Sequence, residues 1–149
     1  MRICVMVCGR VPEALEDVFS PYVESFRALL SPYLPEAAFS GASVIDGEFP
    51  ASVDDHDVYI FSGSPHGVYE DLDWIRESEA FVRRAAEAGK VLVGGCFGHQ
   101  LIAQALGGEV RKSERGWGMG VHRHALTLRE PWMQGGPDAV NVVVSHQDQ

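Results

Sequence analysis

A cysteine lies between glycines in the segment VLVGGCFGHQLIAQALGG, residues 91–108. Apolar residues precede it, as in a buried strand, and a helix-like pattern follows it. The core of the segment, GGCFG, has the G-x-nucleophile-x-G form of a sharp strand-to-helix turn that exposes a reactive side chain. We therefore predict that Cys96 is a nucleophile at the carboxyl edge of a sheet. The competing interpretation is a buried small residue, with glycines that serve only packing.

A second glycine turn could complete the same site. The segment FSGSPHGVYED, residues 61–71, follows an apolar run that predicts a strand over residues 57–64. Parallel strands end at the same edge of a sheet, so we expect this turn beside Cys96. A backbone amide at Ser64 could then pair with the Phe97 amide to hold an oxyanion. The alternative is a plain turn built from common turn residues.

The elements that must position these turns alternate along the chain. We expect helices within residues 13–30 and over 72–88 and 97–108, and strands at 2–8, 37–46, 57–64, 91–95, 109–114, 120–128 and 141–146. This alternation predicts an α/β fold: a mostly parallel sheet flanked by helices, of the flavodoxin-like kind, with a nucleophile elbow. Ser20 is expected to cap a helix that has Pro21 in its first position. Cys4 and Cys8, on the first strand, are expected to be inert core thiols.

Composition narrows the possible functions. The 149 residues include 12 basic and 21 acidic ones, a formal charge of −9 that argues against binding to nucleic acid. The sequence contains no apolar run long enough for a membrane span, and its three cysteines favour a reducing, cytoplasmic location over a disulfide scaffold. A glycine-rich phosphate loop with lysine is absent, so we expect no use of ATP and no cofactor. His122 and His124 share a strand face but lack a nearby third ligand, so we expect no metal.

Three motifs in order resemble the class I glutamine amidotransferases. GGCFGHQLIAQALGGEV is similar to the family's nucleophile segment, FSGSPHGVYED to its oxyanion strand, and VVVSHQD to the segment that holds the amino-acid end of glutamine. The stretch RGWGMGVHRHALT resembles stand-alone, GMP synthase-like members. The resemblance implies that residues 1–149 form a single amidotransferase-like domain that is incomplete at its C-terminus.

The resemblance also implies roles for individual residues. Cys96 would attack the side-chain amide of glutamine, form a γ-glutamyl thioester and release ammonia, after which water frees glutamate. Backbone amides of Phe97 and Ser64 would hold the oxyanion, although glycine is more common in the family at Ser64. The residues implied to bind the substrate are Gly63, Gln100, Ser145, His146 and Asp148.

The family's general base is not found in this sequence. The resemblance implies a histidine and a glutamate in a His-Pro-Glu-like segment beyond SHQD, and the 149 residues contain no such segment. His99 is a weak substitute, because helical geometry points it away from the line of attack of the sulfur. His146 is also a weak substitute, because the resemblance implies a binding role at that position. The sequence is then either part of a longer protein that supplies this segment or a remnant that lacks it, and we expect an isolated chain of this length to be poorly stable or to associate.

Several functions remain open at this point. The first is glutamine hydrolysis that supplies ammonia to a separate synthetase, and a variant acts on another γ-glutamyl compound. The second is a non-catalytic remnant that binds glutamine or docks to a synthetase. A third is a cysteine-based stress or redox protein; such proteins usually have histidine after the cysteine, and Phe97 stands there.

Overall fold

The computed structural model describes residues 1–15, 17–133 and 135–148. The chain divides into two compact units, Met1–Val110 (unit 1) and Arg111–Gln149 (unit 2). A single domain over residues 1–149 therefore stays a prediction.

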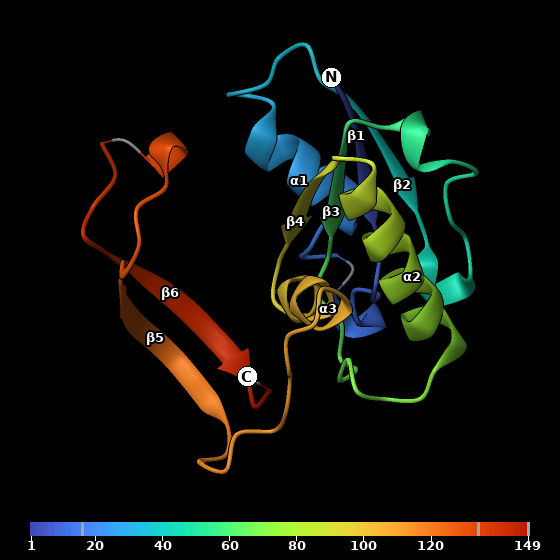
Figure 1. Cartoon of the computed structure of the whole chain (residues 1–149). Coiled ribbons are helices and arrows are strands. Elements are labelled where there is room, and N and C mark those ends of the chain that lie inside the picture. The colour runs from blue at the N-terminus through green and yellow to red at the C-terminus, as the bar shows by residue number, and fades with distance from the viewer. Residues whose placement is uncertain (16, 134, 149) are drawn as a thin grey trace. The chain divides into compact units, whose positions relative to one another are not determined.

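Unit 1 is built on a four-stranded parallel sheet in the order β2–β1–β3–β4 (Figure 1). Its strands are β1 (Arg2–Met6), β2 (Ala38–Ala42), β3 (Val58–Phe61) and β4 (Val91–Gly94). Its helices are α1 (Tyr22–Leu30), α2 (Asp73–Glu87) and α3 (Phe97–Ala105). Short 3-10 turns occupy Glu13–Leu15, Val44–Asp46 and Val53–Asp55. This arrangement confirms the predicted α/β fold class, because each parallel pairing requires a crossover connection.

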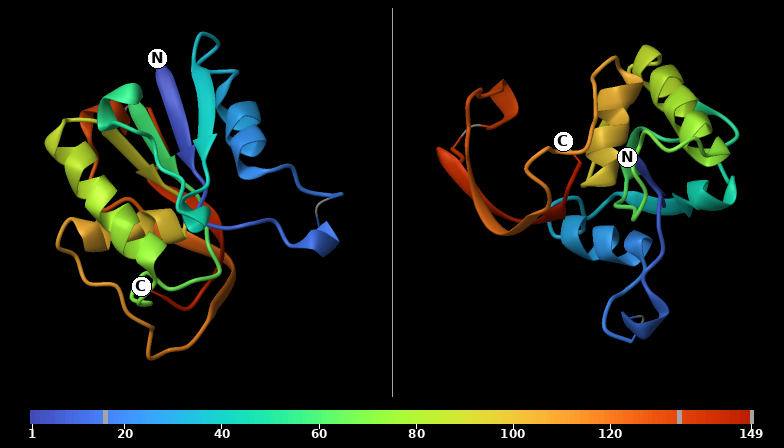
Figure 2. Two further views of the ribbon diagram at one scale, coloured as in Figure 1. Left: turned by 90° about the vertical axis from the view of Figure 1, so that its right-hand side faces the viewer. Right: turned by 90° about the horizontal axis from the view of Figure 1, so that it is seen from below.

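Helices lie on both faces of the sheet (Figure 2), and its central strands β1 and β3 are buried. Along β1 and β3, alternate residues face opposite sides, as the pleat of a strand dictates. Tyr59 and Phe61 belong to the larger core cluster, which α2 and α3 complete. Ile3 and Ile60 belong to a smaller cluster packed against Phe26 and other residues of the α1 side. Burial on both faces explains why these strands read as continuous apolar runs.

Two local predictions are wrong. The helix cap is Pro21, not Ser20, and α1 begins at Tyr22. Residues 109–114 form no strand; within them only Lys112 makes an isolated antiparallel bridge, to Asp148. This short segment is rich in charged residues, which are depleted in strands.

Unit 2 contains a β-hairpin. Strand β5 (Gly118–Ala125) pairs antiparallel with β6 (Ala139–His146), and a 3-10 turn, Pro131–Met133, lies between them. Most residues of both strands are exposed, including the directly paired Val121 and Val143. The hairpin thus differs from the sheet of unit 1, whose central strands are buried.

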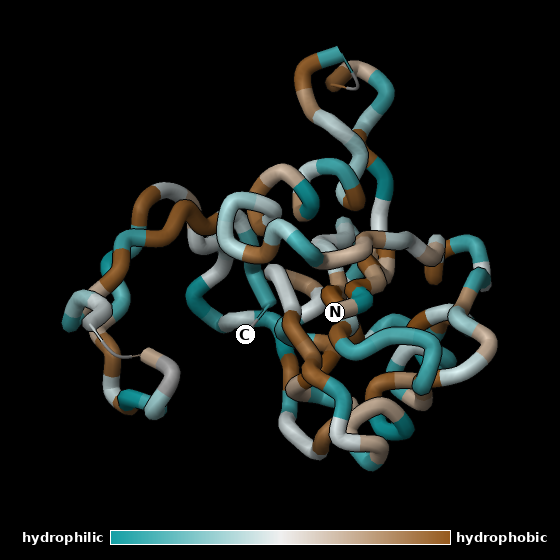
Figure 3. The backbone as a smooth tube through the Cα atoms, turned by 90° about the horizontal axis from the view of Figure 1, so that it is seen from above, coloured by the Kyte–Doolittle hydropathy of each residue, from teal (hydrophilic) through white to brown (hydrophobic). Residues whose placement is uncertain are grey.

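Hydrophobic and hydrophilic residues are interspersed along the backbone (Figure 3). Among the described residues, no helix combines the length and the apolar character that crossing a membrane requires.

Candidate functional site

Cys96 occupies the turn between β4 and α3 in an unusual backbone conformation. Its φ is 52° and its ψ is −111°, and among the described residues it is the only one other than glycine with a positive φ. Residues other than glycine rarely adopt a positive φ, because their Cβ then crowds the backbone. The thiol is also exposed. The turn therefore presents a strained, accessible sulfur directly before a helix.

The glycines around Cys96 are required by packing. A Cβ on Gly94 would lie 2.3 Å from the backbone nitrogen of His99, and a Cβ on Gly98 would lie 2.3 Å from the carbonyl oxygen of Phe61. Both distances are far shorter than any carbon–oxygen or carbon–nitrogen contact in a packed protein. The glycines thus let α3 begin directly against the ends of β3 and β4, and this holds Cys96 in its turn.

The first turn of α3 directly follows Cys96. Phe97 is the first residue of the helix, and the carbonyl of Cys96 accepts hydrogen bonds from the amides of His99 and Gln100 at 3.0 and 3.2 Å. Amides at the start of a helix have no acceptor within the helix and carry its positive dipole end. The role of the Phe97 amide as an oxyanion donor stays a prediction.

The turn after β3 lies against Cys96 through Gly63. A Cβ on Gly63 would be 4.0 Å from the Cβ of Cys96. The next residue, Ser64, accepts a hydrogen bond from the His66 amide on its Oγ at 3.2 Å, so its side chain stabilises the turn. Its own backbone amide remains the proposed second oxyanion donor.

A carboxylate stabilises the rest of this turn. Glu70 accepts a hydrogen bond from the Gly67 amide at 2.7 Å, and its other oxygen lies 2.8 Å from Nδ1 of His66. The His66 ring packs edge-on against Trp74, which in turn packs against the buried ring of Phe97. The turn after β3 is thus joined to the first residue of α3 by a continuous set of contacts.

Two residues of α1 also approach the elbow, and the sequence patterns do not assign them a site role. The hydroxyl of Tyr22 lies 3.7 Å from the position of a Cβ on Gly63, and Phe26 Cζ lies 4.0 Å from that of a Cβ on Gly95. Burial raises the pKa of the Tyr22 phenol, and the negative charge of a thiolate at Cys96 or Cys8 raises it further. In the sequence, Tyr22 and Phe26 are indistinguishable from the other members of an apolar helical stripe.

Cys4 and Cys8 are buried, in contrast to Cys96. Burial raises the pKa of both thiols, that of Cys8 to about 12. The backbone amide of Cys8 donates to Ser62 Oγ at 2.9 Å, and its thiol contacts the Met6 carbonyl at 3.4 Å. These two thiols are embedded in the core, as predicted.

The residues predicted to bind the substrate fall in both units. Gln100 lies on the first turns of α3, close in sequence to Cys96, whereas Ser145 and His146 end strand β6 opposite Met119 and Gly118. Asp148 follows them and bridges to Lys112 within unit 2. A shared site between these unit 2 residues and Cys96 stays a prediction.

The described residues include no group of three or more histidine, cysteine, aspartate or glutamate side chains placed to hold a metal ion. The rings of His122 and His124 are neighbours on β5, with centroids 6.4 Å apart.

Comparison with known proteins gives this geometry a context. Residues 40–149 match the family described as Glutamine amidotransferase class-I. The chain is 31% identical over 113 residues to gamma-glutamyl peptidase 4 of Arabidopsis thaliana, an alignment that covers 71% of this chain and 45% of the peptidase. It is 30% identical over 109 residues to one of the subunits of the glutamine-hydrolyzing GMP synthase of Sulfurisphaera tokodaii, covering 72% of this chain and 56% of that protein.

Solved structures share the fold. A glutamine amidotransferase from Thermotoga maritima superimposes with a TM-score of 0.79 at 18% identity, over 100% of this chain and 61% of that one. A second, from Methylobacillus flagellatus, gives a TM-score of 0.72 at 24% identity, over 99% of this chain and 55% of the other. The chain spans about half the length of the curated relatives that it matches.

Proposed function

Because the chain belongs to the class I glutamine amidotransferase family, we propose that it carries the nucleophile and the oxyanion donors of an enzyme that cleaves the side-chain amide of a γ-glutamyl group. The observation that carries the proposal is the backbone of Cys96, which is exposed, has a positive φ and directly precedes α3. Strained residues other than glycine persist where the surrounding structure enforces them, and they concentrate at active sites.

The proposed reaction begins at the sulfur. The Cys96 thiol releases its proton to solvent, and the thiolate attacks the amide carbon of the γ-glutamyl group, forming a carbon–sulfur bond while the carbonyl electrons move to oxygen. The amides of Phe97 and Ser64 donate hydrogen bonds to that oxyanion. Collapse of the intermediate breaks the carbon–nitrogen bond, and the amine leaves after accepting a proton from solvent. Water then attacks the γ-glutamyl thioester, which frees glutamate and restores the thiol.

The remaining predicted residues have binding roles in this proposal. Gln100, Ser145, His146 and Asp148 would hold the α-amino and α-carboxyl groups of the substrate, with Asp148 facing the ammonium. Gly63 would admit the substrate next to the sulfur, because a side chain at this position would lie within 4.0 Å of the Cys96 Cβ. Such fixed binding of the distant end of a substrate places the scissile amide for attack.

A general base is not among the residues that carry this proposal. The 149 residues contain no His-Pro-Glu segment. For this chain we therefore propose substrate binding and attack by Cys96, and rapid turnover at neutral pH would require a base from a further segment of polypeptide.

Trapping the thioester tests the proposal. The purified chain, incubated with L-glutamine and hydroxylamine at alkaline pH, is expected to form γ-glutamyl hydroxamate, because hydroxylamine cleaves thioesters. Cys96→Ala should reduce the rate at least about a thousandfold, and Cys4→Ala, which removes a buried thiol, should retain activity if its unfolding midpoint stays above the assay temperature. Hydroxamate formation by Cys96→Ala at the wild-type rate would contradict the role of Cys96.

Protection of the thiol separates catalysis from binding alone. If L-glutamine slows alkylation of Cys96 and no hydroxamate forms, the chain is a glutamine-binding remnant. If neither occurs, the proposed activity is wrong for this chain.

Two forms of the reaction have support from different relatives. The similarity to a GMP synthase from Sulfurisphaera tokodaii favours glutamine as substrate, with ammonia passed to a separate synthetase. The similarity to gamma-glutamyl peptidases favours a γ-glutamyl peptide, from which a larger amine would leave. Comparison of ammonia release from glutamine with amino-acid release from a γ-glutamyl dipeptide distinguishes these two forms.

A further inference from the structure

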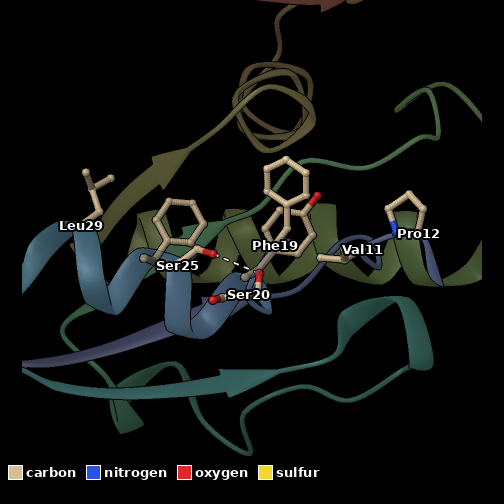
Figure 4. Close-up of a pocket in the computed structure, with 8 residues that line it drawn as sticks. Val11, Pro12, Phe19, Ser20, Ser25 and Leu29 are labelled. Atoms are coloured by element: carbon tan, nitrogen blue, oxygen red, sulfur yellow. Dashed lines mark hydrogen bonds between the residues drawn. The ribbon is translucent and has the colours of Figure 1, made fainter. Parts of the chain in front are cut away.

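An apolar cavity lies between the segment after β1 and helix α1. We call it the α1 cavity; it has a volume of about 380 Å³, and its lining includes Val11, Phe19, Tyr22, Phe26 and Leu29. Figure 4 shows Leu29 at one end and Val11 with Pro12 at the other, with Phe19 between them. Phe19 and Leu29 are 55% and 63% exposed although both side chains are large and apolar. Their exposure leaves apolar surface open to a ligand.

The α1 cavity adjoins a second hollow of about 420 Å³ that shares Val11, Phe19 and Tyr22 and extends to Gly9. A Cβ on Gly9 would lie 3.0 Å from the carbonyl oxygen of Gly63. The segment after β1 therefore packs directly against the turn that lies next to Cys96.

Two aromatic residues of the cavity lining also approach the residues next to Cys96. Tyr22 lines both hollows, and its hydroxyl approaches Gly63, which itself faces the Cys96 Cβ. Phe26 lines the α1 cavity, and its Cζ approaches Gly95. The same two side chains thus form part of the cavity wall and approach two glycines close to Cys96, Gly63 in space and Gly95 in sequence.

The chemistry of the lining decides which part of a substrate fits there. The amino-acid end of a γ-glutamyl group carries an ammonium and a carboxylate, and burying either against apolar side chains is costly. Arg10, at the edge of the second hollow, is paired with Asp46. Ammonia, the amine that leaves glutamine, is too small to contact Phe19 or Leu29. The amine part of a larger γ-glutamyl amide, when it has an apolar side chain, fits both the polarity and the size.

We propose that the α1 cavity is the subsite for the leaving amine, and that it selects γ-glutamyl amides whose amine carries an aromatic or aliphatic side chain. This inference rests on the proposed attack by Cys96 on a γ-glutamyl amide. It adds a specificity-determining role for Phe19 and Leu29, with Tyr22 and Phe26 as the connection to the sulfur.

Protection of Cys96 from alkylation tests the subsite without requiring turnover. The rate of Cys96 modification by iodoacetamide is measured in the purified chain at increasing concentrations of γ-L-glutamyl-L-phenylalanine, γ-L-glutamylglycine or L-glutamine. The phenylalanine dipeptide should halve the rate at about a tenth of the concentration needed for the glycine dipeptide, because a buried benzyl group adds at least that much affinity.

Alanine variants of two lining residues test whether the cavity causes this selectivity. Phe19→Ala and Leu29→Ala should each reduce the preference for the phenylalanine dipeptide about fivefold to tenfold. Tyr33→Ala removes an aromatic ring that is 80% exposed and lies outside the cavity lining, and it should leave the preference unchanged. Phe19 and Leu29 are exposed, so their replacement should not unfold the chain, and a thermal melt checks this.

The possible results separate the two proposals. Equal protection by the two dipeptides, or a preference that survives both Phe19→Ala and Leu29→Ala, overturns the subsite and leaves the Cys96 reaction standing. Failure of all three compounds to protect Cys96 overturns the proposed reaction, and the subsite with it.

Discussion

The three cysteines of unit 1 lie in two regions with opposite properties. In and just after β1, Cys4 and Cys8 are buried, and burial raises the pKa of Cys8 to about 12. At the turn between β4 and α3, Cys96 is exposed and has a positive φ. β1 and β4 belong to the same parallel sheet, separated by β3.

This difference shows that position in the sheet, not residue type, decides what each thiol can do. A thiol inside the sheet contacts apolar neighbours and cannot easily ionise, because a charge there would lose its hydration. A thiol at the carboxyl edge, before a helix, meets solvent and free backbone amides. Four predictions test this contrast and the packing behind it, from the largest expected effect to the smallest.

Alkylation should distinguish the two regions most strongly. In the folded chain, iodoacetamide should modify Cys96 more than about a thousandfold faster than Cys4 or Cys8, because the buried thiols react only after large-scale opening. Peptide mass spectrometry over time measures the three rates. In concentrated urea the rates should agree within a few-fold. Rapid modification of Cys8 in the folded state would remove the contrast.

Replacing a glycine of the elbow should destabilise unit 1 strongly. Gly98→Ala places a Cβ 2.3 Å from the Phe61 carbonyl oxygen, and the required shift of α3 should cost about 3 kcal/mol of unfolding free energy. Gly89→Ala is the matched control; it has a φ of +68° and open space around it, so it should cost only about 1 kcal/mol. Urea denaturation measures both, and equal losses would show that packing does not hold the elbow.

Relief of the Cys96 backbone should stabilise the chain. Cys96→Gly is expected to be more stable than Cys96→Ala by about 1 kcal/mol, because only glycine adopts φ 52° and ψ −111° without crowding. Both variants lack the thiol, so the comparison isolates the backbone. An alanine variant as stable as the glycine variant would mean that this conformation is not strained.

The smallest effect concerns His56, whose Nε2 lies 2.7 Å from the Oγ of Ser40 on β2. Burial lowers the pKa of His56 below the ordinary 6.5, and the positive charge of Arg2 lowers it further. The negative charges of Asp55 and Asp57 partly oppose this shift. Its neutral form is therefore favoured in the folded chain. The stability that it contributes is complete above pH 6.5 and declines as the pH falls through the lowered folded pKa.

Comparing wild type with His56→Gln measures this contribution. Between about pH 7.5 and about pH 5.5, wild type should lose slightly more unfolding free energy than the variant, because glutamine does not titrate. Urea denaturation at the two pH values supplies the comparison. An identical loss in the two proteins would contradict the lowered pKa.

Much of the secondary structure of unit 1 could be predicted, because the residue patterns that indicate each strand or helix lie within that element. Buried parallel strands need continuous apolar runs, and the buried strands β1 and β3 fall inside the predicted ranges. The more exposed strand β4 also falls inside its predicted range. The predicted helix over residues 72–88 matches α2, Asp73–Glu87. The helical spacing of its apolar residues indicated the helix, and the glycine after it indicated where the helix ends. The prediction for residues 109–114 was wrong because a short charged segment carries little information on its pairing.

Part of the candidate site could be predicted from the sequence and part could not. The Cys96 turn was predictable, since Gly94 and Gly98 lie within a few residues of the cysteine. The approach of Tyr22 to Gly63 was not, because it joins residues far apart in sequence on different elements. An apolar stripe shows which face of a helix is buried, but not which residue it meets.

By itself the sequence determined the α/β fold class, the thiol at a strand-to-helix turn and the family motifs, because strand and helix periods and glycine spacings act over a few residues. Only the tertiary structure decided the strand order β2–β1–β3–β4, the contact of Gly63 with Cys96, and the apolar cavity formed by α1 and the segment after β1. These features depend on which apolar surfaces pack against each other away from water, and that is a property of the folded chain as a whole.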